Sequence, residues 1–111
     1  MKKIVNNIIP LKGFTAMTLY PFVFVRKDNE QNYTPIVERH ENIHGEQQKE
    51  MLIVFFLVWY VIERLIKLFY YQNTKTAYKN ISFEREAYDN ASDVVYLDNR
   101  KHFAFIHYIW R

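Results

Sequence analysis

The 111-residue chain has no cysteine, only two glycines and only three prolines. Without cysteine, disulfides and thiolate metal sites are excluded, so any metal must be held by His, Asp or Glu. There is no arginine-rich arm and no basic tract with interleaved aromatics, and the net charge is a mild +3, so nucleic acid is not an expected partner. Half of the residues are hydrophobic and 18% are aromatic, which argues against disorder. We therefore predict a single domain, residues 1–111, with a modest core.

The N-terminus begins with Met1-Lys2-Lys3, like a signal peptide, but it lacks a continuous apolar core and a small-residue cleavage site. We therefore expect this segment to remain in the mature protein. The expected location is the cytoplasmic side of a membrane, with a soluble cytoplasmic protein as the alternative.

The pattern of residues predicts an α+β fold that is mainly helical. Residues 14–25 are rich in residues of high β propensity and are interrupted by Pro21, which predicts a short strand or hairpin. Thr34-Pro35 is a strong helix start, with an N-cap residue followed by a proline at the first helical position. We expect a motif helix plus an apolar helix over residues 35–71, a helix over 80–92 capped by Asn80 or Ser82, and a terminal helix over 98–111. The strand region would thus be followed by three to four helices.

The motif helix carries the pentapeptide His40-Glu41-Asn42-Ile43-His44, which has the form H-E-x-x-H. On an α-helix, His40 and His44 lie one turn apart on the same face, close enough for both imidazoles to bind one metal ion. Glu41 is rotated to one side, where it can take a proton from a water molecule at the metal. This spacing predicts a Zn²⁺ site for amide hydrolysis that still needs a third protein ligand.

The third ligand must come from a separate part of the chain. The metzincin form, in which a third histidine follows the motif shortly after a glycine turn, is excluded, because the next histidine after His44 is His102. The remaining candidates are Glu84, Glu86, Asp89, His102 and His107. Glu84 and Glu86 point to different sides of their predicted helix, so at most one of them is expected to face inward.

Two segments together resemble the gluzincin metallopeptidases, in which H-E-x-x-H is joined by a glutamate from a later helix. Glu84-Arg85-Glu86-Ala87-Tyr88 resembles the second gluzincin motif, and His40 to Gln47 is similar to an H-E-x-x-H-x-x-Q variant of small, bacterial gluzincin-like proteins. The resemblance covers about 50 residues of this chain. The gluzincins include membrane-linked members.

The gluzincin resemblance implies a role for each matching residue. It makes His40, His44 and Glu84 the zinc ligands and Glu41 the general base, and it makes the strand region 14–25 a substrate-binding edge. Tyr88 departs from the pattern, because many membrane-linked gluzincins have an aspartate there that hydrogen-bonds a ligand histidine. Tyr88, His102 and His107 are the candidates for stabilising an oxyanion.

Residues 51–62 form an uninterrupted apolar run, which continues with Glu63, Arg64 and Lys67 among further apolar residues up to Tyr71. A helix that is apolar on all sides must be covered. Since the uncharged run is shorter than the roughly 20 residues of a membrane span, we expect a membrane-embedded or membrane-surface segment, with a buried core helix or a homo-oligomer interface as alternatives.

Three functions remain open at this point. The first is a minimal membrane-associated zinc metallopeptidase that acts on a peptide or protein substrate. The second is a non-catalytic module in which zinc stabilises a small fold, or which binds a partner. In the third, the H-E-x-x-H motif is accidental in a membrane-binding or partner-binding module.

Overall fold

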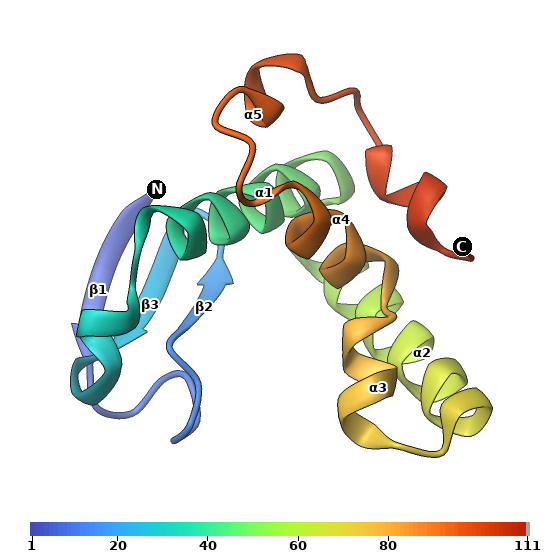
Figure 1. Ribbon diagram of the computed structural model, residues 1–111, viewed down its shortest axis with the longest axis horizontal. Helices are drawn as coiled ribbons and strands as arrows, with labels where there is room; N and C mark the ends of the chain where they lie inside the picture. Colours follow the sequence, from blue (N-terminus) through green and yellow to red (C-terminus); the bar gives the residue numbers. More distant parts are fainter. Residues whose placement is uncertain (111) are drawn as a thin grey trace.

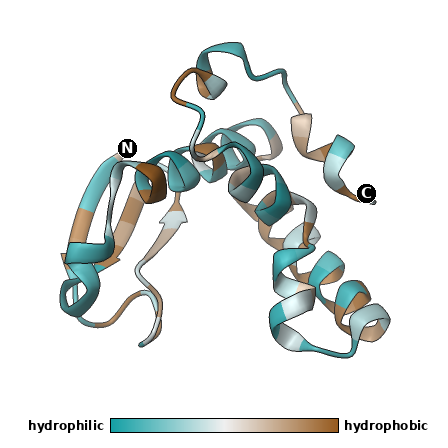
Figure 2. Cartoon of the chain, viewed as in Figure 1, coloured by the Kyte–Doolittle hydropathy of each residue, from teal (hydrophilic) through white to brown (hydrophobic). Residues whose placement is uncertain are grey.

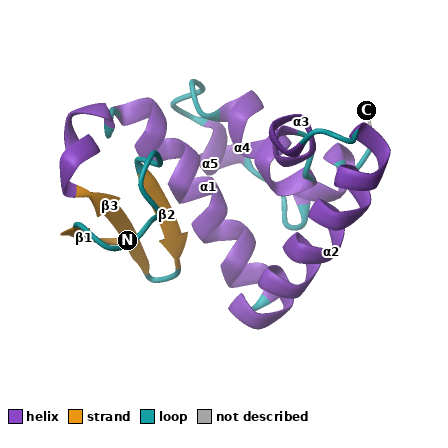
Figure 3. Cartoon of the chain, turned by 90° about the horizontal axis from the view of Figure 1, so that it is seen from below, coloured by secondary structure: helices purple, strands orange, loops and turns teal. Residues whose placement is uncertain are grey.

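Three short strands form a mixed sheet at one end of the molecule (Figure 3). In the computed structural model, which describes residues 1–110, β1 (Lys2–Asn6) pairs in parallel with β3 (Phe22–Arg26). The antiparallel partner of β3 is β2 (Ala16–Leu19), so the strand order is β1-β3-β2 and β2 is an edge strand. The predicted strand region 14–25 contains β2 and all of β3 except its last residue, Arg26. β1 was not predicted, because five residues without clear alternation do not stand out from a loop.

The first long helix, α1 (Pro35–Met51), begins where Thr34-Pro35 predicts it. The Thr34 hydroxyl accepts a hydrogen bond from the Val37 amide at 3.3 Å, and Pro35 occupies the first turn. The helix ends at Met51, and the next residue, Leu52, has a φ of +61° that turns the chain directly into α2 (Ile53–Tyr71). The predicted span 35–71 therefore consists of two helices joined by one residue. α2 in turn ends at Tyr71 and is followed by Gln72, which has a left-handed helical conformation.

Two shorter helices follow, α3 (Thr74–Lys79) and α4 (Ser82–Asn90). α3 was not predicted, since its polar residues resemble a turn. α4 lies within the predicted range 80–92, but the expected cap is wrong, because the N-cap residue is Ile81 and no side chain caps the helix. Ser82 instead donates from its backbone N–H and its hydroxyl to the Glu63 carboxylate of α2, so its side chain is engaged in a tertiary contact.

The prediction of one terminal helix over residues 98–111 is wrong for the residues that the structure describes, and residue 111 lies outside them. This region contains only the end of α5 (Tyr96–Asn99) and a 3₁₀ segment, η2 (Ala104–Tyr108). Arg100 is extended and held by buried carboxylates, and Phe103 has a φ of +60°, so neither residue continues a helix. A second 3₁₀ segment, η1 (Lys27–Asn32), follows the sheet. The predicted α+β, mainly helical fold class is confirmed, with more and shorter helices than expected.

α1 runs between the two parts of the molecule, with the sheet on one side and α2, α3 and α4 on the other, and α5 lies above it in this view (Figure 1). A hydrophobic core fills the space between α2, α4 and the C-terminal segment and consists of three phenylalanines and one isoleucine, namely Phe56, Phe83, Phe105 and Ile81. α1 itself is largely hydrophilic (Figure 2), yet many of its polar side chains are buried. Polar contacts, rather than apolar packing alone, therefore position this helix.

A buried ion cluster ties the C-terminal segment to α1 and α4. The Arg100 guanidinium donates to both Glu50 carboxylate oxygens, at 2.8 and 3.0 Å, and to both oxygens of Glu86, at 2.5 and 3.1 Å. All three side chains are at most 5% exposed. Because one cation neutralises two carboxylates in the interior, the loss of Arg100 would leave two unpaired buried charges.

We expect Arg100→Met to lower the free energy of unfolding by about 3–5 kcal/mol, the usual cost of breaking a buried ion pair from one side. Lys49→Met is the matched control, because Lys49 pairs with Glu46 at 2.8 Å on the surface, where both side chains are more than 40% exposed. This control should cost less than about 1 kcal/mol. Urea denaturation of the two variants measures both values, and equal losses would contradict the assignment.

Candidate metal centre

The structure brings His40 and His44 of α1 together with Glu84 of α4, and all three side chains are buried. The Nε2 atoms of the two histidines lie 3.1 Å apart, and Glu84 Oε1 lies 3.2 Å from His40 Nε2 and 3.1 Å from His44 Nε2. Ligand atoms bound tetrahedrally to one Zn²⁺ at about 2.0–2.1 Å are roughly 3.3 Å apart. The three atoms therefore have the separation that a single metal ion requires.

The Gln47 side-chain amide fixes the tautomer of His44. Gln47 Nε2 donates to Glu86 Oε1 at 2.9 Å and to the Phe83 carbonyl at 3.2 Å, so the amide oxygen must face the other way. That oxygen lies 2.8 Å from His44 Nδ1, and an amide oxygen can only accept, so Nδ1 carries the proton. In the neutral ring, Nε2 is then the atom with a free lone pair, and it points at His40 and Glu84.

Aromatic residues support the other two members of the group. The Tyr60 hydroxyl of α2 donates to Glu84 Oε2 at 2.8 Å, which leaves Oε1 directed at the histidines. Burial, followed by the negative charge of Glu84, raises the pKa of Tyr60 far above its ordinary value, so Tyr60 stays a donor. The ring of Tyr88 packs edge-on against His40, with centroids 4.5 Å apart. Tyr88 thus contacts a ligand histidine through its ring, where an aspartate of the gluzincin pattern would supply a hydrogen bond.

The charges within the group favour a cation between the three atoms. Burial of the His44 ring lowers its pKa, but the charge and hydrogen bond of Glu84, together with Glu41 and the hydrogen bond to Gln47, outweigh burial and raise the pKa of His44 to about 9 in the metal-free protein. Burial raises the pKa of Glu84, whereas His44 and His40 lower it more, and the pKa lies well below its usual range. An ionised carboxylate and two imidazole nitrogens form a donor set that fits Zn²⁺.

Glu41 lies beside the ligands and is held by the edge strand of the sheet. The Thr18 hydroxyl of β2 lies 2.7 Å from Glu41 Oε1 and 3.2 Å from the Glu41 carbonyl oxygen. The next contact along α1 is made by Gln48, whose amide donates to the Thr18 carbonyl at 2.8 Å and accepts from the Tyr20 N–H at 2.6 Å. These bonds fix β2 against the helix that carries the motif, and they orient the Glu41 carboxylate.

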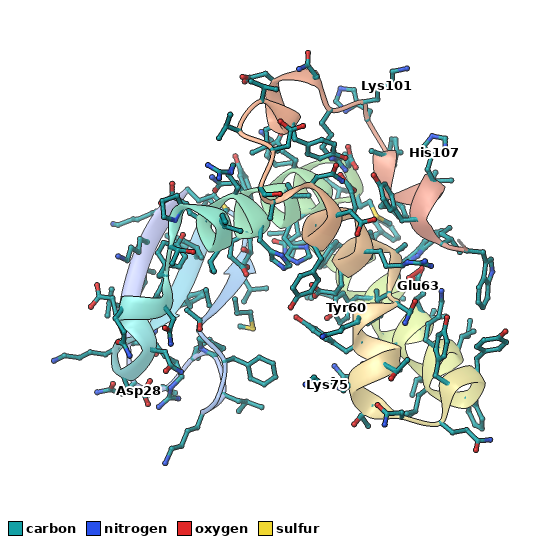
Figure 4. The ribbon with its side chains drawn as sticks, in the orientation of Figure 1. Asp28, Tyr60, Glu63, Lys75, Lys101 and His107 are labelled. Carbon is teal, nitrogen blue, oxygen red and sulfur yellow. The ribbon has the colours of Figure 1, made fainter. Side chains whose placement is uncertain are left out.

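A cleft of about 650 Å³ opens next to His40, His44 and Glu84 and is bounded by the sheet on one side and α2 and α3 on the other. This volume lies within the usual range for ligand sites. Phe14, Ala16 and Met17 line its sheet side, and Tyr60 and Lys75 line the opposite wall. Figure 4 shows Lys75 on the side of α3 that faces the sheet. Glu41, His40, His44 and Glu84 all border this cleft.

The remaining sequence candidates for the third ligand lie elsewhere. Glu86 is bonded to Gln47, Arg100 and Tyr96. Asp89 is exposed, and the side chain of His102 is 92% exposed, with its ring 3.6 Å from Glu50. His107 lies exposed on the C-terminal segment (Figure 4). His102 and His107 are therefore also removed from the cleft as candidate oxyanion stabilisers, and Tyr88 is the one of those three that lines it.

Sequence reasoning missed several residues that hold the site in place. Thr18 contacts Glu41 and Tyr60 contacts Glu84 across 23 and 24 positions of the chain. Gln48 contacts Thr18 across 30 positions, and no local pattern signals such pairings. Glu86 was considered only as a candidate for the third metal ligand, and its bonds to Gln47 and Arg100 were not foreseen. Gln47 was noted as part of the motif variant, and its position three residues after His44 is the one available signal, since i and i+3 side chains meet on a helix.

Comparison of the chain with protein-family models, with curated proteins and with solved structures found no match. The arguments for a function therefore rest on the geometry of the site and on the sequence motifs.

We predict that Gln47→Leu weakens zinc binding by about 10- to 100-fold, because His44 loses the acceptor that fixes its tautomer and ring orientation. Competition with a chromophoric chelator measures the dissociation constant. Gln31→Leu is the matched control, since Gln31 is exposed on η1 and should leave zinc affinity unchanged. Equal zinc affinities of the wild type and Gln47→Leu would show that the amide does not orient the ligand.

We also predict that zinc binding releases a proton from His44. The raised pKa, about 9, means that Nε2 of this ring is protonated at neutral pH in the metal-free protein. The proton must leave when a metal takes its place, so zinc affinity should rise by about tenfold per pH unit between roughly pH 7 and 8. Calorimetry in two buffers of different ionisation enthalpy measures the protons released. A pH-independent affinity over this interval would contradict the coupling of His44 to Glu84.

Proposed function

We propose that this protein is a zinc-dependent peptide hydrolase in which His40, His44 and Glu84 hold the metal and Glu41 is the general base. The observation that supports this most strongly is the convergence of the His40, His44 and Glu84 ligand atoms at 3.1 to 3.2 Å inside a cleft that Glu41 also borders. The gluzincin-like motifs assign the same roles to these residues.

A bound Zn²⁺ would polarise the substrate carbonyl and make a water molecule more acidic. The chain supplies the remaining chemistry. The Glu41 carboxylate takes the proton of the attacking water and passes it to the leaving amine, as a general base that then acts as a general acid. Thr18 keeps this carboxylate oriented through its hydroxyl, 2.7 Å from Oε1. Tyr60 holds Glu84, and Gln47 holds His44, so that the ligand set does not rearrange during turnover.

The edge of β2 provides a place for an extended peptide. The Arg26 N–H donates to the Thr15 carbonyl at 3.0 Å, which shows that Thr15 faces β3. Backbone groups alternate in direction along a strand, and Gln48 meets the Thr18 carbonyl and the Tyr20 N–H from the opposite side. Ala16 shares the direction of Thr18, so its backbone groups face the cleft. A substrate main chain would pair there, and Gln48 covers the edge beyond it.

Two phenols of the cleft are suited to stabilise a developing oxyanion. The hydroxyls of Tyr78 and Tyr88 lie 3.4 Å apart, and both residues line the cleft that contains the ligands. Burial, followed by the charge of Glu84, raises the pKa of Tyr78 far above its ordinary value, so it remains protonated and can donate. Tyr88 is the closer of the two to the ligands, because its ring contacts His40.

A non-catalytic zinc module is the second candidate, and a specific feature favours it. The three ligands join α1 to α4 across 40 to 44 positions of a chain whose buried hydrophobic residues are few, so zinc would cross-link the fold. Both candidates require zinc at the same three residues. They differ in whether Glu41 performs a reaction.

We expect one zinc ion per chain, lost in each of His40→Ala, His44→Ala and Glu84→Ala and retained in Glu41→Gln. His102→Ala is the control, because that side chain is exposed and away from the cleft. Metal analysis after dialysis gives the stoichiometry. Cleavage of a mixed peptide library by the wild type should fall by at least about 100-fold in Glu41→Gln. Zinc at full occupancy with identical wild-type and Glu41→Gln peptide profiles would favour the non-catalytic module.

A further inference from the structure

The outward surface of α2 is mostly apolar, while two of the three charged side chains of the same helix, those of Glu63 and Lys67, are buried. Glu63 is 6% exposed and Lys67 is fully buried. Large apolar side chains that are at least 43% exposed occupy the outer surface of α2, namely Val54, Phe55, Leu57, Val58, Val61, Ile62, Leu65, Ile66 and Phe69. Hydrophobic segments recur along this helix in Figure 2. This arrangement is the reverse of a surface helix of a globular protein, which turns its apolar side inward.

The inward charges are satisfied within the protein. Glu63 accepts from the backbone N–H and the hydroxyl of Ser82, and Figure 4 shows it on the side of α2 that faces the C-terminal segment. Lys67 donates to the Ile109 carbonyl at 2.5 Å and lies 3.9 Å from the centre of the Trp110 ring. Arg64 is therefore the one exposed charged residue of α2, and it lies at the border between the outer surface and the cleft.

The apolar surface continues onto the C-terminal segment. A second hollow, of about 680 Å³, lies between α2 and the residues Phe103, Ile109 and Trp110. Phe55, Val58 and Ile62 line it from the helix. Trp110 is 58% exposed and carries an indole N–H, so it suits the boundary between an apolar phase and water.

The charges next to this surface have one sign. Between residues 52 and 81 the only acidic residue is Glu63, which is buried, whereas Arg64, Lys75 and Lys79 are exposed. All three cations line the wall of the cleft that α2 and α3 form, along one edge of the apolar surface. An apolar face bordered by cations is complementary to a bilayer that contains anionic lipid.

A bilayer fits these features better than a second copy of the chain does. One partner helix covers a stripe, yet the exposed apolar residues of α2 occupy more than one side of the helix. Apposed copies would also bring like charges of Arg64, Lys75 and Lys79 toward each other. Among the described residues, no helix has both the length and the apolar character that a transmembrane span requires. The geometry points to a helix that lies in the plane of the membrane interface.

We propose that the outer surface of α2, together with Trp110, binds the surface of an anionic lipid bilayer, with Arg64, Lys75 and Lys79 among the headgroups. The proposal does not depend on zinc or on peptide hydrolysis. It places the opening of the cleft next to the membrane surface, because the same cations border both.

The test is co-flotation of the purified full chain with phosphatidylcholine vesicles that contain about one-third phosphatidylserine. We expect the wild type to float and its tryptophan emission to shift to the blue. The double variant Val61→Glu/Leu65→Glu should bind at least about tenfold less, because two side chains that would enter the lipid become charged. Val94→Glu is the matched control, since Val94 is 70% exposed outside this surface, and it should float as the wild type does.

A second variant tests the electrostatic part. Arg64→Gln/Lys75→Gln/Lys79→Gln should weaken binding to the anionic vesicles by roughly fivefold per cation and should change binding to pure phosphatidylcholine little. Wild type that stays unbound in the presence of both vesicle types overturns the proposal. A stable lipid-free dimer that the Val61→Glu/Leu65→Glu variant disperses overturns it in favour of a second copy. Circular dichroism of each variant verifies that it is folded.

Discussion

The side-chain amide of Gln47 is the contact on which the arrangement of the site depends. It accepts from His44 on one side and donates to Glu86 and the Phe83 carbonyl on the other, so it joins the face of α1 that carries His40 and His44 to α4. Glu86 in turn binds Arg100, and Arg100 binds Glu50 near the end of α1. The hydrogen bonds thus form a closed circuit from α1 through α4 and the C-terminal segment back to α1. Such a circuit favours one arrangement of these side chains over others, because every buried polar group in it must keep its hydrogen-bond partners.

α1 carries two sets of side chains with different tasks. His40 and His44 face α4, where Glu84 completes the ligand set, whereas Glu41 and Gln48 contact β2. One helix therefore fixes the distance between the candidate metal and the strand edge at which a peptide would pair. The sheet and the helical part meet chiefly through α1. The cleft lies between them because α1 contacts β2 with one set of side chains and α4 with the other. The apolar face of α2 lies outside this arrangement and is free to serve another contact.

Local signals in the sequence were sufficient for part of the fold and of the site. Thr34-Pro35 marks the start of α1 because N-capping and proline at the first turn are local effects, and the spacing of His40 and His44 follows from helix geometry. Glu84 was singled out only through the gluzincin resemblance, since reasoning from residue types left five candidates. The structure now places it against both histidines. The assignment of zinc and of hydrolysis stays a proposal.

Long-range contacts account for what the sequence could not predict. Tyr60 and Thr18 support the site from elements 20 or more positions away, and Ser82 was assigned to a cap although it binds Glu63 of α2. The prediction of a terminal helix over 98–111 failed because of another long-range contact: two buried carboxylates hold Arg100 in an extended conformation. The apolar composition of α2 was evident from the sequence, but the burial of Glu63 and Lys67 appears only in the structure.

The central claim is that His40, His44 and Glu84 bind one zinc ion through their Nε2 and carboxylate atoms. X-ray absorption spectroscopy at the zinc edge of the reconstituted protein tests it most directly. We predict a four-coordinate ion with two imidazole ligands, which give the outer-shell scattering of the rings, and oxygen as the remaining donors, all at about 2.0–2.1 Å. A six-coordinate oxygen shell without imidazole scattering would contradict the assignment.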